Sequence, residues 1–150
     1  MSNISLFDFW EYYDDKTKGF LTLLTDEQLT FQPYPGMKTL GEELRHILDV
    51  RDLYLRAMTE GTGPSWKEKR MDPEMAVSIE KLRAYYNDLV ERFAAFQASE
   101  IDWSHVVPWE GMGDPDVEGC LNFLIHFECT HQGALSVYIA GLGLEYDIAG

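Results

Sequence analysis

Apolar residues along the chain recur at spacings of three, four and seven, which is the period of an α-helix rather than of a strand. The pattern predicts helices over 4–24, from about 40 to 60, from 78 or slightly earlier to about 98, and from about 117 to 142. The segment 101–115 has no clear period. We therefore expect an all-α fold, a four-helix bundle of the up-down type with a long loop between helices three and four.

Local signals mark several helix ends. Thr39-Leu40-Gly41-Glu42 has the form of a capping box, in which the threonine and glutamate side chains satisfy free backbone N–H groups of the first turn. Asp72-Pro73-Glu74 is a plausible start for the third helix, although the regular pattern begins only near Ser78. Asp114 or Asp116 is expected to cap the fourth helix.

The fourth helix carries two polar residues close to its apolar stripe. At about 100° per residue, His131 falls within that stripe, and Glu128, three residues earlier, lies about 60° away. His46 lies on the inward side of the second helix. Buried imidazole and carboxylate groups need partners. Each histidine is therefore either a hydrogen-bonded core residue or part of a site.

A metal site is one chemistry that this pattern favours. Glu-x-x-His on one helix supplies two metal ligands in some helix bundles, and here that spacing is Glu128 to His131. His46 would supply a third ligand and leave a position open for water or substrate. His126 lies about 140° from His131 in a regular helix, so only a π-bulge would bring both rings together. His105, in the aromatic loop, is better explained as a surface or loop-packing residue.

Composition narrows the class of protein. The chain has 150 residues, of which 45% are hydrophobic, and we expect a single domain over 1–150. A net charge of −14 disfavours nucleic acid and anionic membranes as partners. No segment approaches 18 uncharged apolar residues, and no basic leader is present. Cys120 and Cys129 lie too far apart along one helix for a disulfide, so we expect reduced thiols and a cytoplasmic protein.

Two motifs resemble the DinB/YfiT-like superfamily. They are Thr39-Leu40-Gly41-Glu42-Glu43-Leu44-Arg45-His46 on the second helix, and Thr130-His131-Gln132-Gly133 followed by Tyr138 and Gly141-Leu142-Gly143 on the fourth. The likeness extends over nearly the whole chain in helix order and length. It implies a four-helix bundle, often a homodimer, that binds a divalent metal, commonly zinc or nickel, through one histidine of helix two and two of helix four.

Two of the three family ligands have counterparts here. His46 matches the helix-two ligand and His131 matches the later helix-four ligand. The remaining ligand usually lies four residues before His131, where this chain has Phe127. Three alternatives follow: Glu128 completes the set, His126 shifts into it through a bulge, or the site is lost. We take the metal ligands as His46, His131 and Glu128.

The resemblance also implies a reaction. Some family members are thiol-dependent S-transferases, so we expect a divalent-metal-dependent thiol S-transferase or hydrolase acting on a small-molecule substrate, with a low-molecular-weight thiol as co-substrate. A metal-bound thiolate or water would be the nucleophile. The alternative is a non-catalytic bundle with a degenerate metal site, which binds a small apolar ligand or a protein partner.

Overall fold

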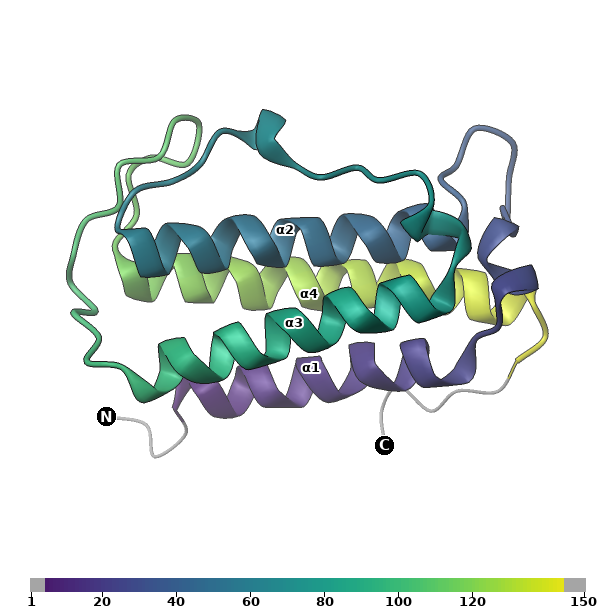
Figure 1. The fold of residues 1–150 in the computed structure, drawn as a ribbon, viewed down its shortest axis with the longest axis horizontal. Helices are drawn as coiled ribbons and strands as arrows, with labels where there is room; N and C mark the ends of the chain where they lie inside the picture. The colour runs from purple at the N-terminus through teal and green to yellow at the C-terminus, as the bar shows by residue number, and fades with distance from the viewer. Residues whose placement is uncertain (1–4, 145–150) are drawn as a thin grey trace.

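The computed structural model describes residues 5–144 and consists of four long helices with three short 3-10 helices in the connections (Figure 1). The α-helices are α1 (Leu6–Leu23), α2 (Leu40–Glu60), α3 (Ile79–Ala98) and α4 (Val117–Gly141). The 3-10 helices are η1 (Asp26–Thr30), η2 (Trp66–Glu68) and η3 (Met75–Val77). The all-α bundle is therefore confirmed. Ile4, where the predicted first helix began, lies outside the described residues.

The helix directions differ from simple up-down alternation. α2 and α3 run in the same direction, because residues 61–78 cross the length of the bundle before α3 begins (Figure 1). α4 returns antiparallel to α2 and parallel to α1. The sequence left a connection between the second and third predicted helices, but it did not predict that this connection crosses the bundle. Hydrophobic period indicates where helices lie along the chain and says little about how a polar segment is routed between them.

The capping signals explain where α2, α3 and α4 begin. Thr39 and Glu42 form the predicted capping box of α2. Ser78 caps α3, so the helix starts at the later of the two expected positions. Asp116, rather than Asp114, caps α4 by accepting a hydrogen bond from Gly119 N. Within the loop 99–116, Val106 and Asp116 form one isolated antiparallel bridge.

The core runs along the centre of the bundle between all four helices. Burial of large apolar side chains is the main favourable term in such a fold. The fully buried residues include Phe20, Leu40, Leu44, Ile47, Leu48, Leu53, Leu82, Leu121, Leu124 and Tyr138.

Two glycines allow segments to pack closely on the helix ends near the candidate site. A Cβ at Gly41 would lie 1.7 Å from the carbonyl oxygen of Ala76, so η3 sits directly on the start of α2. A Cβ at Gly141 would lie 2.7 Å from the ring of Phe31. The Tyr138 hydroxyl donates to the carbonyl of Lys38. Together these contacts hold the start of α2 against the end of α4.

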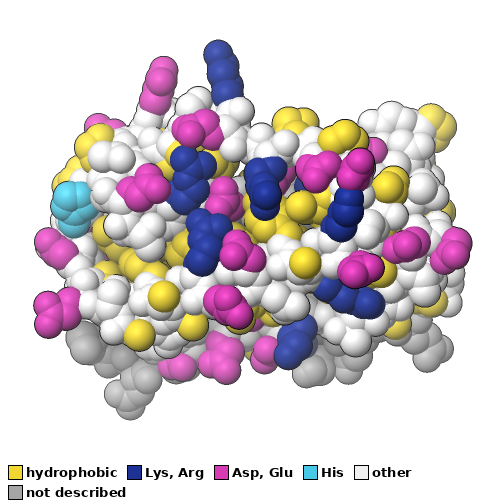
Figure 2. Space-filling view, in the orientation of Figure 1, with side chains coloured by type: hydrophobic (Ala, Val, Ile, Leu, Met, Phe, Trp, Pro, Cys, Tyr) yellow, Lys and Arg dark blue, Asp and Glu magenta, His cyan; other side chains and the backbone are white. Residues whose placement is uncertain are grey.

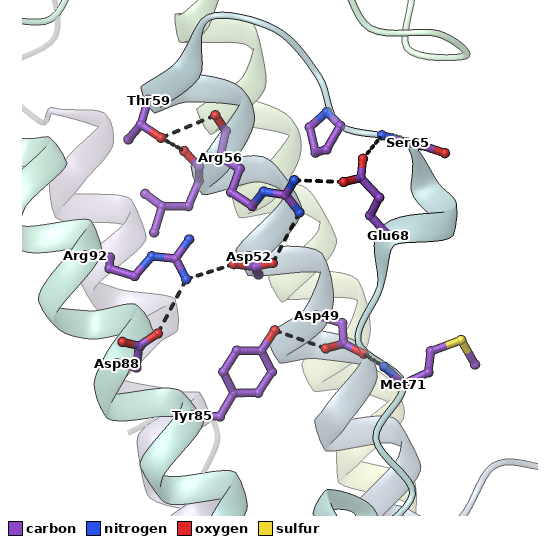
Figure 3. A network of polar contacts seen from close by, with 12 residues as sticks. Asp49, Asp52, Arg56, Thr59, Ser65, Glu68, Met71, Tyr85, Asp88 and Arg92 are labelled. Atoms are coloured by element: carbon purple, nitrogen blue, oxygen red, sulfur yellow. Dashed lines mark hydrogen bonds and ion pairs between the residues drawn. The ribbon is translucent and has the colours of Figure 1, made fainter.

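Charged residues fasten the crossing segment 61–78 and α3 onto α2 (Figure 3). Glu68 pairs with Arg56 and accepts from the backbone N–H of Ser65. Deeper in the same face, the buried Asp49 carboxylate accepts from the Tyr85 hydroxyl and from Met71 N. Burial raises the pKa of Asp49 despite these hydrogen bonds. The crossing segment is thus attached along its length by side chains of α2.

The visible charges do not form a basic patch. In Figure 2, Lys and Arg side chains are interspersed with Asp and Glu on the face that carries the crossing segment and α3. Asp52, for example, lies between Arg56 and Arg92. No helix among the described residues combines the length and the apolar character that crossing a bilayer requires.

Candidate functional site

The structure brings His46 and His131 together between α2 and α4. Their ring centroids lie 5.1 Å apart at an interplanar angle of 63°. His46 lies in the second turn of α2 and His131 lies past the middle of α4, which runs antiparallel to it. Glu43, one turn before His46 on α2, contacts His131, with its Oε1 2.5 Å from Nδ1 of that ring. The site therefore consists of two imidazoles and one carboxylate from two helices.

The electrostatics around Glu43 define the tautomer of His131. Burial opposes ionisation of Glu43, but the hydrogen bond to His131, with smaller contributions from the nearby charges, outweighs it and lowers the pKa of Glu43. Its position in the first turn of α2 also favours a negative charge. An ionised carboxylate only accepts, so Nδ1 of His131 carries the proton and donates. Nε2 has no hydrogen-bond partner among the described residues and is left as the acceptor.

His46 is electrically neutral near pH 7. Burial, followed by the positive charges of Lys38 and Lys69, lowers the pKa of His46 to about 4. The ring is only half-buried. A neutral imidazole provides one acceptor and one donor nitrogen. Beside His131, it gives the site an uncharged group that can hold a polar ligand.

Phe127 closes one side of the two imidazoles. Its ring centroid lies 4.0 Å from that of His131, with the planes tilted by 34°, and 5.5 Å from that of His46. The position at which the resemblance expects a third histidine is therefore occupied by an apolar ring in contact with both others.

Glu128 lies apart from the histidines, in a separate cluster. It is fully buried and accepts two hydrogen bonds from Arg51 and one from Thr17. Both carboxylate oxygens are thus engaged between α1, α2 and α4. The angle of about 60° between Glu128 and His131 placed both residues inward, but α4 has two inward sides, and Glu128 faces Arg51 while His131 faces Glu43. The structure does not place Glu128 where a third ligand would be needed.

Arg51 is the centre of this second cluster. Its guanidinium also donates to Asp14, at 2.7 Å, and lies over the ring of Trp10 at 4.6 Å. Asp14 in turn accepts from the Tyr86 hydroxyl at 3.0 Å. Burial opposes the charge on Arg51, but Glu128 and Asp14 outweigh it and raise its pKa. The cluster is a charge network in which each buried polar group has a partner.

The remaining sequence candidates lie outside the site. α4 is regular from Val117 to Gly141, without the π-bulge that His126 would need, and His126 is exposed. Nε2 of His105 lies 3.1 Å from the carbonyl of Gly61, so His105 packs one long connection against the other. Cys120 is buried and Cys129 is exposed, and both are free.

The donor set does not fit the three-ligand metal centre that the resemblance implies. Structural and catalytic zinc sites take at least three protein ligands. Here two imidazoles meet, Phe127 replaces the third, and the nearby carboxylate of Glu43 is bonded to Nδ1 of His131. Within 5–144, no group of three His, Cys, Asp or Glu side chains is arranged to hold a metal ion.

Glu43 and Arg51, the central polar residues of the two clusters, were not identified from the sequence. Glu43 directly follows Glu42 of the capping box, and an acidic residue is common in the first turn of a helix, so nothing in the local sequence marks it as unusual. Its spacing of three before His46 puts both on one helix face, which was the available signal. Arg51 has apolar residues one turn before and after it on α2, and a buried arginine is rare enough to indicate an internal carboxylate partner.

Comparisons with known proteins agree with the fold. The chain is similar to a crystal structure of a DinB-like protein from Bacillus cereus ATCC 10987, with 22% sequence identity and a TM-score of 0.77. The match covers 95% of this chain and 93% of that one. A comparison with curated proteins finds none that matches. The family model of the DinB superfamily matches residues 12–135, and the chain therefore belongs to the DinB superfamily.

Proposed function

We propose that the chain acts on a small molecule at the His46–His131 site, where a thiol or a water molecule attacks an electrophile. The observation that carries this proposal is the hydrogen bond between Glu43 and Nδ1 of His131. A carboxylate that holds one imidazole nitrogen leaves the other oriented as a general base. Nε2 of His131 would take the proton from the attacking S–H or O–H group, and Glu43 would stabilise the imidazolium that forms.

The proposed step is a proton-coupled substitution. The nucleophile forms a bond to the electrophilic carbon, the leaving group departs with its electron pair, and the proton passes to Nε2 of His131. His46, which is neutral, would hold the substrate or the leaving group by a hydrogen bond. Because only two of the three family ligands are present, no metal ion takes part in the proposed reaction.

Rates with small model substrates test this proposal. Glutathione with 1-chloro-2,4-dinitrobenzene reports S-transfer, and p-nitrophenyl acetate reports hydrolysis. His131→Gln should abolish the catalysed rate, and Glu43→Gln should lower kcat about tenfold to a thousandfold by removing the group that orients the base. His126→Gln, an exposed change on the same helix, is the matched control. Equal rates in the wild type and His131→Gln would contradict the proposal.

Elemental analysis tests the metal-free form of the mechanism. The sample is protein purified without chelator and without metal-affinity resin. We expect zinc and nickel well below one atom per chain. A stoichiometric metal that is lost in His131→Ala would instead support the metal-dependent transferase implied by the resemblance.

A non-catalytic role is the second candidate, and the position of Phe127 favours it. An apolar ring in contact with both imidazoles is suited to binding an apolar molecule or to closing a degenerate site. In that case His131→Gln would alter ligand binding or stability and leave the model reactions unaffected.

A further inference from the structure

A cavity of about 220 Å³ lies at the seam between α1 and α3, apart from the His46–His131 site. α1 and α3 run antiparallel there, since Phe7 packs on Phe93 and Asp14 bonds Tyr86 (Figure 1). Ala94 is exposed and lines the cavity, so we place it at the rim. The volume corresponds to that of about seven water molecules. A small organic molecule fits this space.

The wall of the cavity has an apolar part and a polar part. Phe7, Leu89 and Phe93 provide apolar surface from both helices. Glu11 and Asp14, three residues apart on α1, are neighbours on one helix face and line the same cavity. This arrangement, apolar walls with a few polar groups at one side, is typical of small-molecule sites.

The charge at the polar side is negative. Arg51 also lines the cavity, but its hydrogen bonds go to Asp14 and Glu128, so its charge is already compensated. Among the lining residues, the two carboxylates of Glu11 and Asp14 outnumber that one cation. An anionic ligand would face this excess, whereas a monocation would reduce it.

The same region already holds one cation against aromatic rings. The Arg51 guanidinium lies 4.6 Å from the centroid of Trp10 and 5.5 Å from that of Tyr86. Cation–π contacts of this kind strengthen as water is excluded. Aromatic rings and carboxylates therefore already stabilise one positive charge in this part of the bundle.

We propose that the cavity binds a small organic monocation with an apolar body, a primary alkyl- or arylalkylamine. The ammonium group lies beside Asp14 and Glu11, and the apolar body lies against Phe7, Leu89 and Phe93. The cavity is separate from the proposed catalytic histidines, so amine binding does not depend on the proposed function.

NMR titration of the full chain at pH 7 with n-hexylamine tests this site. At that pH the amine is a cation. We expect saturable shifts of the backbone amides of Phe7, Glu11 and Ala94, with an affinity at least tenfold higher than for 1-hexanol. Equal affinity for the alcohol, tighter binding of hexanoate, saturable shifts confined to other helices, or no saturable shift would each overturn the proposal.

Two pairs of variants distinguish binding of the amine in the cavity from its nonspecific attraction to an acidic protein. Glu11→Gln should raise the Kd for hexylamine about threefold, since an exposed ion pair contributes little more, and Glu80→Gln, the same charge change elsewhere, should not. Ala94→Trp should fill the rim and abolish binding. Ala98→Trp, an exposed change beyond the cavity, should leave binding intact. Identical effects of the two tryptophan variants would overturn the proposal.

Discussion

α2 and α4 face each other through two polar clusters that differ in burial and in charge. In the Arg51–Glu128 cluster, the side chains are 4% and 0% exposed and the groups are ionised and fully paired. In the His46–His131 cluster, His131 is 23% exposed, and one of its ring nitrogens has no partner within 5–144. Buried charges that are fully paired serve the fold, whereas an oriented ring nitrogen without a hydrogen-bond partner can take part in a reaction.

Removal of Arg51 should have the largest effect on stability. Arg51→Met leaves the buried carboxylate of Glu128 and the partly buried carboxylate of Asp14 without their cation, and we expect a loss of about 3–5 kcal/mol. Urea unfolding at pH 7 measures it. Arg56→Met, which removes two more exposed ion pairs, should cost less than about 1 kcal/mol. A similar small loss for Arg51→Met would show that the first cluster is not structural.

Phe127→His should convert the second cluster into a metal site. A third imidazole next to His46 and His131 supplies the missing ligand, and we expect zinc affinity to rise at least about tenfold, or about 1.4 kcal/mol. Competition with a chromogenic chelator measures it. Phe123→His, an exposed change on the same helix, is the control. Equal zinc affinity in both variants would contradict the placement of the two imidazoles.

Thr17→Val should destabilise the buried cluster by about 1 kcal/mol. The change keeps the shape of the side chain but removes a donor to Glu128 and an acceptor for Gln132. Thermal or urea unfolding measures the difference. Thr22→Val, which removes an exposed hydroxyl on the same helix, should be close to neutral.

The protonation of His46 should produce the smallest effect, below about 1 kcal/mol once partial exposure is allowed for. Its folded pKa of about 4 lies below the unfolded value of 6.5. Above pH 6.5 the ring is neutral in both states, so the contribution is fully present. Between pH 6.5 and 4 the unfolded chain binds the proton first, and stability is lost.

Comparison of the wild type with His46→Phe isolates that contribution. Unfolding free energies at pH 7 and pH 5 should fall less in the variant than in the wild type. His126→Phe, which alters an exposed histidine, should preserve the wild-type dependence. The same pH dependence in all three proteins would contradict the lowered pKa of His46.

The positions of the helices could be predicted from the sequence, but most of the side-chain contacts between them could not. Periodicity and the Thr39 capping box located α2 closely, because these are local signals. Glu128 and His131 both meet residues of α2, but Glu128 bonds Arg51 and Thr17 whereas His131 bonds Glu43, and the sequence does not give the register of α4 against α2 and α1 that separates them. His46 and His131 met as expected. Glu43 was overlooked because a first-turn acid has a common local explanation.

Residues 61–78 are attached to the rest of the bundle at several points, so the chain can be cut within this segment without losing those contacts. The segment is held by stacking of Trp66 on Trp109 and by the Asp49–Met71 hydrogen bond, while α2 and α3 also pair directly through Asp52 and Arg92. A backbone cut between residues 68 and 69 would break none of these contacts. The two fragments, 1–68 and 69–150, should therefore reassemble into a nicked bundle when mixed.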